Sequence, residues 1–123
     1  SYNVAVGGGA LDDLYESSDN NVAVGKSAGG GMVGPGTNNT FTGFYSGTAN
    51  VDGIFNTFSG QLSGAANTSG SRNTFLGAIA GRYNTTGDWA TACGGYNTGL
   101  AIVNDYARYC VSNKNYKAKW VSY

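Results

Sequence analysis

The sequence predicts an all-β fold, a parallel β-solenoid (β-roll) of about seven coils with about 17–18 residues each. The main observation is an Asn-x-x-x-Gly motif, found at Asn3–Gly7, Asn21–Gly25, Asn39–Gly43, Asn56–Gly60 and Asn73–Gly77. The step from one motif glycine to the next is therefore 18, 18, 17 and 17. A fixed short period indicates that one supersecondary unit is stacked on copies of itself. The composition agrees, because 21 glycines occur with one proline and many aromatic residues, which is not typical of a disordered chain.

Cutting the chain before each motif asparagine gives a single repeat domain, 1–123, with seven coils. The last two coils are placed by the period alone. The predicted coils are 3–20, 21–38, 39–55, 56–72, 73–89, 90–106 and 107–123. Parallel strands stack about 4.8 Å apart, so seven coils predict a rod of roughly 35 Å.

Each coil is expected to contain a strand, a sharp corner, a second strand and a polar turn that leads back to the next coil. The three residues before the motif glycine are β-branched, aromatic or small, as at 22–24 and 74–76, and predict a strand. A second short strand is expected after the glycine, for example at 44–46 and 78–80. An Asn/Thr/Gly stretch such as 67–70 predicts the turn that closes the coil.

Stacking in register places like residues above one another. Aromatic residues at one position predict a stacked column of Phe41, Phe58 and Phe75, and the motif residues predict an amide ladder that includes Asn39, Asn56 and Asn73. The pattern leaves open whether the phenylalanines face the interior of their own coil or a partner chain. Because so small a coil encloses little volume, we expect a homo-oligomer with chains side by side or end to end.

The two cysteines, Cys93 and Cys110, are one period apart and occupy the same position in successive coils. Strands about 4.8 Å apart bring two Cα atoms within the range of a disulfide, which is the predicted state. The alternative is a pair of small buried thiols. A disulfide implies an oxidising, extracellular setting. No metal or other cofactor is expected, since the chain has no histidine and no further cysteine.

Charge is balanced overall but not along the chain. Seven acids and seven bases give zero net charge, which argues against a nucleic-acid partner, and no apolar run reaches the length of a membrane span. Acids gather in the first coil and bases in the last: Asp12, Asp13, Glu16 and Asp19 against Arg108, Lys114, Lys117 and Lys119. Opposite charges at the two ends favour head-to-tail filaments. The alternative is that both sets are ordinary solvated end coils.

No catalytic constellation emerges, so the chain is not expected to be an enzyme. A Ser–His or Cys–His pair is impossible without histidine. The acids Asp52, Asp88 and Asp105 fall on turns of separate coils. Because the chain begins at Ser1 rather than at methionine, we expect a processed form.

Residues 73–87, which begin Asn-Thr-Phe-Leu-Gly, closely resemble the repeats of bacteriophage tail fibres and related bacterial surface fibres. Residues 21–28, Asn-Val-Ala-Val-Gly-Lys-Ser-Ala, are similar to the head repeats of trimeric autotransporter adhesins. The resemblance implies a parallel β-roll, three chains side by side and a role in attachment. It implies no catalytic residues.

The expected function is therefore that of a self-assembling structural fibre protein, at a cell surface, in the extracellular space or on a virion. One alternative is a segment that binds a receptor or a cell-surface glycan through exposed aromatic rings. The candidates are Tyr45, Tyr83, Trp89, Tyr96, Tyr106, Trp120 and Tyr123. Another is an ice-binding protein with a threonine column at Thr40, Thr57, Thr74 and Thr91, although neighbouring phenylalanines are expected to roughen that face.

Overall fold

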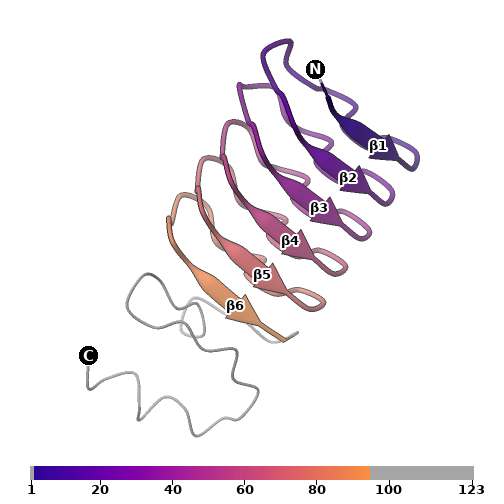
Figure 1. Cartoon of the computed structure of the whole chain (residues 1–123). Coiled ribbons are helices and arrows are strands. Elements are labelled where there is room, and N and C mark those ends of the chain that lie inside the picture. The colour runs from indigo at the N-terminus through magenta and orange to yellow at the C-terminus, as the bar shows by residue number, and fades with distance from the viewer. Residues whose placement is uncertain (1, 95–123) are drawn as a thin grey trace, which may run out of the picture.

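A computed structural model describes residues 2–94 of the chain. They contain six three-residue strands and no helix: β1 (Val4–Val6), β2 (Val22–Val24), β3 (Thr40–Thr42), β4 (Thr57–Ser59), β5 (Thr74–Leu76) and β6 (Thr91–Cys93). The strands form one sheet in the order β1-β2-β3-β4-β5-β6, and the chain makes one coil between each strand and the next (Figure 1). This part of the chain is a parallel β-solenoid of about five turns.

The strands pair in the register that the sequence period predicts. Val22 lies beside Thr40, and Thr57 lies beside Thr74, so each residue pairs with the one a single repeat further along the chain. All five strand pairs are parallel. The predicted parallel β-solenoid is therefore confirmed for residues 2–94. The seven-coil division extends beyond them and stays a prediction.

The segments after the motif glycines are turns, so the prediction of a second strand at 44–46 and 78–80 is wrong. The Ser46 amide donates a hydrogen bond of 3.2 Å to the carbonyl of Gly43, which closes a four-residue turn. Within it, Tyr45 has a φ of 55°, and Ile79 has 66° at the same position of its coil. Such angles belong to the left-handed region and do not occur in an extended strand.

The reason lies in the spacing of two glycines. Gly43 and Gly47 are four residues apart, and both have positive φ, at 126° and 58°. Two bends so close together reverse the chain before a strand can form. The turns still stack, because the Tyr45 amide donates to the carbonyl of Lys26 and the Gly47 amide to that of Ser63, each at 2.9 Å. Hydrogen bonds between coils thus continue through the turns.

The interior is filled by one column of aromatic rings. Phe41, Phe58 and Phe75 are fully buried within their own coils, which settles the direction they face. Their ring centroids are 5.3 Å apart for the first pair and 4.7 Å for the second, with interplanar angles of 29° and 11°. In the second coil the column position is Ala23, which pairs with Phe41 but leaves room for a larger side chain. Leu11 belongs to the same buried cluster and occupies part of that room.

A glycine faces each ring from the opposite wall of the coil. Gly64 has a φ of 58°, and a Cβ built on it would overlap the ring of Phe58. The same relation holds between Gly81 and Phe75. The missing side chain therefore provides the width that a phenyl ring needs inside so narrow a coil.

The motif asparagines form a buried amide ladder beside the rings. The amide N–H of Asn56 donates to Oδ1 of Asn39 at 2.9 Å, and that of Asn73 donates to Oδ1 of Asn56 at 3.0 Å. The Nδ2 group of Asn56 donates to the carbonyl of Gly70 at 2.8 Å. Each side chain thus links its coil to the next one and also fastens its own return turn, which satisfies the polar atoms that these residues bury.

A second asparagine ladder runs parallel to the first. Nδ2 of Asn67 donates to Oδ1 of Asn50, and Nδ2 of Asn84 donates to Oδ1 of Asn67, each at 2.8 Å. Sequence reasoning missed this ladder because it followed only asparagines that precede a glycine by four. The signal was present, since these three residues are also one repeat apart.

Candidate functional site

The outward face of the sheet is one candidate surface, because rings and amides fill the interior. The central residue of strands β2 to β6 points inward and is buried, while the flanking residues point outward. Large apolar side chains are exposed there: Val4 by 50%, Val6 by 56%, Val24 by 38% and Leu76 by 55%. The strand face, defined by the outward residues of β1–β6, is therefore a flat mixture of apolar and hydroxyl groups.

One edge of the strand face carries the predicted threonine column. Thr40, Thr57 and Thr74 are exposed, and Thr91 is partly buried. The expected roughening of this face by phenylalanines is wrong, because their rings lie inside the coil. The neighbouring outward column is irregular, with the sequence Val6, Val24, Thr42, Ser59, Leu76 and Cys93.

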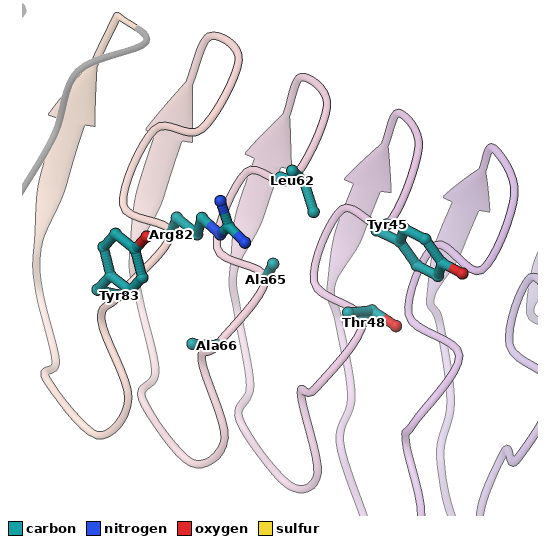
Figure 2. Close-up of a pocket in the computed structure, with 7 residues that line it drawn as sticks. All are labelled: Tyr45, Thr48, Leu62, Ala65, Ala66, Arg82 and Tyr83. Atoms are coloured by element: carbon teal, nitrogen blue, oxygen red, sulfur yellow. The ribbon is translucent and has the colours of Figure 1, made fainter.

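A second candidate surface lies on the turns, where two hollows follow one another along the rod. The larger hollow, which we call the tyrosine hollow, has a volume of about 420 Å³. Its lining, drawn in Figure 2, is Tyr45, Thr48, Leu62, Ala65, Ala66, Arg82 and Tyr83. Ala65 and Ala66 occupy the positions that Arg82 and Tyr83 hold one coil later. Two small residues between bulky neighbours therefore create the depression.

The second hollow, of about 280 Å³, lies over the glycines of the second coil. Gly30 and Gly31 occupy the same two positions there, and Asp12 and Asp13 occupy them one coil earlier. Tyr45 contributes to both hollows and separates them. The surface formed by the turns thus carries the carboxylates of Asp12 and Asp13 on the first coil and the guanidinium of Arg82 on the fifth.

The charge in the tyrosine hollow comes from Arg82. Its side chain extends toward the coil that holds Leu62 and Ala65 (Figure 2). The guanidinium carbon lies 5.3 Å from the centre of the Tyr83 ring. Among the described residues, no ion pair involves Arg82. The guanidinium donors can therefore bind an anion without first losing a carboxylate partner.

Another arginine is stacked between two exposed rings at a different edge of the coil. Arg72 lies 5.5 Å from the centre of the Phe55 ring and 5.2 Å from that of Trp89. Phe55, Arg72 and Trp89 all have positive φ, at 58°, 59° and 57°. Each of the three directly precedes the residue that the next coil places in the first asparagine ladder or, for Trp89, the equivalent position, Ala90. The arginine lies against the indole, which reduces the access of a sugar ring to Trp89.

The predicted end contacts are placed only in part. Asp12, Asp13 and Glu16 are exposed and Asp19 is partly buried, and the first two line a lateral hollow. Their proposed partners lie outside the described residues: Arg108, Lys114, Lys117 and Lys119. Cys93 is partly buried on β6, but Cys110 also lies outside, so their pairing stays a prediction. The aromatic candidates outside are Tyr96, Tyr106, Trp120 and Tyr123.

Residues 2–94 contain no cluster of three or more His, Cys, Asp or Glu side chains suited to a metal ion. The same part of the chain has no helix that is long and apolar enough to cross a membrane. Comparisons with protein-family models, curated proteins and solved structures found no match for this chain.

Proposed function

We propose that the chain is a structural subunit of an extracellular or virion fibre, and that copies associate side by side through the strand face. The observation that supports this most directly is the exposure of Val4, Val6 and Val24 on the adjoining strands β1 and β2, with Leu76 exposed further along the same sheet. Apolar groups gathered on a surface indicate an interaction site more than scattered ones do. The fibre-repeat resemblance agrees with a bundle of chains.

A second copy of the chain is the best partner for this face. The backbone of this face repeats at every coil, so a copy placed alongside meets the same strand spacing along the described rod, with outward side chains that differ from coil to coil. Burial of apolar area contributes about 25 cal/mol per Å². The interior of each described coil holds at most one aromatic ring and a few aliphatic side chains, so additional apolar burial has to come from contact between chains. We propose three chains, as the resemblance implies.

The test is a double variant, Val24→Lys with Leu76→Lys, whose mass in solution is measured by sedimentation velocity. Each lysine places a charge on the strand face without entering the coil. We expect trimers or larger assemblies for the unaltered chain and monomers for the variant, with an unchanged circular dichroism spectrum.

A matched control is Val33→Lys, because Val33 is 54% exposed but lies outside the strands, in the irregular segment that returns to β3. The control variant should assemble like the unaltered chain. Monomers of the unaltered chain at all accessible concentrations, or assemblies that persist in the double variant, would contradict the proposal.

Ice binding is the second candidate, and one observation favours it. The threonine column Thr40, Thr57 and Thr74 is exposed and regular, and the phenylalanines Phe41, Phe58 and Phe75 that alternate with it are buried inside the coil. The neighbouring column contains Val24, Ser59 and Leu76 in no regular pattern, so the face lacks a second hydroxyl row. We therefore favour the fibre and expect no thermal hysteresis in a nanolitre osmometer.

A further inference from the structure

We propose that the tyrosine hollow binds a sugar residue that carries a carboxylate, such as a uronic or sialic acid unit of a surface glycan. This deepens the attachment part of the proposed function and rests on that function for its biological setting. The features that support it are the shape of the hollow, its aromatic walls and its single cation.

The shape suits a small ring-shaped ligand. Ala65, Ala66 and Leu62 form a low apolar floor, while Tyr45 stands at one end and Tyr83 at the other (Figure 2). The hollow, of about 420 Å³, is a shallow depression that is widely open to solvent. A terminal or branching sugar of a larger glycan can therefore lie in it without passing a narrow entrance.

The aromatic residues fit the chemistry of a sugar. A pyranose ring has an apolar face of C–H groups, which packs against aromatic rings, and a rim of hydroxyl groups. Tyr45 and Tyr83 provide rings with a polar tip, and Thr48 adds a hydroxyl at the edge. Tyrosine suits such contacts because few rotatable bonds are fixed on binding.

Arg82 decides the charge of the ligand. A guanidinium presents two parallel N–H donors, which match the two oxygens of a carboxylate. It lies over the Tyr83 ring, and this stacking holds the group beside the hollow. On the other side of Tyr45, the carboxylates of Asp12 and Asp13 repel an anion. One acidic sugar near Arg82 is therefore favoured over a long polyanion along the whole face.

A peptide is a poorer match than a sugar. The backbone groups at the floor already bond between coils: Ala49 N–H donates to the carbonyl of Ala65 at 3.2 Å, and Ala66 N–H to that of Arg82 at 2.9 Å. An extended peptide adds to a sheet through free backbone donors and acceptors. The hollow lacks this edge, so its ligand has to be recognised through side chains.

The experiment is isothermal titration of the full-length chain with a galacturonic acid disaccharide and with sialyllactose. The neutral comparisons are a galactose disaccharide and lactose, and a glutamate-rich peptide tests for simple charge attraction. We expect both acidic sugars to bind about tenfold or more tightly than their neutral counterparts, as for one added charged hydrogen-bonded pair. The two acidic sugars distinguish a uronic from a sialic acid source.

Two variants locate the site. Arg82→Gln should weaken binding of the acidic sugar about tenfold, while leaving the weak neutral binding unchanged. Ala66→Tyr should block both, because it fills the floor with the side chain that the next coil carries at that position, Tyr83. The control is Arg72→Gln, which removes another arginine stacked on aromatic rings but outside the hollow. It should bind like the unaltered chain.

The proposal is overturned by no binding at millimolar sugar, by equal binding of acidic and neutral sugars, by equal binding of the peptide, or by an equal loss in Arg72→Gln. These comparisons on the unaltered chain stand even if one variant fails to fold. Sedimentation of the same samples separates this inference from the fibre proposal. Binding by monomers would leave the site intact and contradict the fibre, whereas assemblies without binding would contradict the site alone.

Discussion

Phe58 shows how much of the fold depends on single side chains. Its ring lies between those of Phe41 and Phe75 and has no exposed surface. The interior has no second layer, so nothing can move in to fill the space left by a smaller residue. A truncation here removes packing from three coils at once.

We expect Phe58→Ala to lower the free energy of unfolding by about 3–5 kcal/mol, the range for aromatic residues in packed cores. Phe55→Ala is the matched control, because Phe55 is half exposed and its loss should cost less than about 1 kcal/mol. Urea denaturation followed by circular dichroism measures both. Equal effects of the two substitutions would show that the ring column is not the main source of stability.

For single residues, the sequence predicts which side chains stack on one another better than it predicts whether they face the interior. The sequence period placed Phe41 above Phe58, and the structure has the same pairing. Whether the rings faced inward was not predictable, because three-residue strands are too short for their alternation to mark one face. The second ladder of Asn50, Asn67 and Asn84 was predictable from spacing alone and was missed.

At the scale of the single coil, the corner after each strand is the position that tolerates substitution least. Gly60 has a φ of 133°, and a Cβ built on it would overlap the carbonyl of Gly77 in the next coil. Two backbones therefore approach each other too closely for any side chain. By contrast, a Cβ on Gly8 would meet nothing within 4 Å.

Gly60→Ala should therefore destabilise the fold by more than about 1 kcal/mol, since alanine meets both strain and a clash at this corner. Gly8→Ala should change stability by no more than about 0.5 kcal/mol, as expected at an open surface position. Thermal unfolding of the two variants, which differ from the parent by the same methyl group, measures the contrast. A neutral Gly60→Ala would mean that coils can separate at their corners without loss.

The same corner glycines explain why β1–β6 were predictable, whereas the second strands expected at 44–46 and 78–80 are turns. Ala78, Ile79 and Ala80 read as a strand by residue type. Their conformation is instead set by Gly77 and Gly81, which bend the chain on both sides. Distance between glycines is thus a better guide than side-chain preference in coils this short.

For the whole molecule, the distribution of charge leads to a proposal of axial assembly. We propose that the acids of the first coil meet the bases of the last coil in the next molecule. Reversing Lys114, Lys117 and Lys119 to glutamate should then shorten or abolish filaments in negative-stain images, because like charges would face each other. Raising the salt concentration should have the same effect on the unaltered chain.

A control is the reversal of Lys26, a base in the second coil that lies 6.0 Å from the centre of the Phe44 ring. Lys26→Glu should leave filament length unchanged. Filaments of normal length in the triple variant would remove the electrostatic basis of axial growth, while leaving side-by-side association untouched.

The hollows were the least predictable feature at this scale. Each depends on a contrast between neighbouring coils, such as Ala65 and Ala66 beside Arg82 and Tyr83. Repeat analysis detects positions where successive coils carry similar residues. It does not detect positions where a small side chain in one coil lies beside a large one in the next. Aligning the coils by their glycines and comparing side-chain volumes would have found both depressions.

The amide ladders also give the rod a direction. At every step described, Oδ1 of an asparagine accepts from the coil that follows it in the chain, and never from the coil before. Within residues 2–94 the side-chain dipoles of the two ladders therefore add along the axis. We expect molecules that meet end on to extend these ladders only when both point the same way.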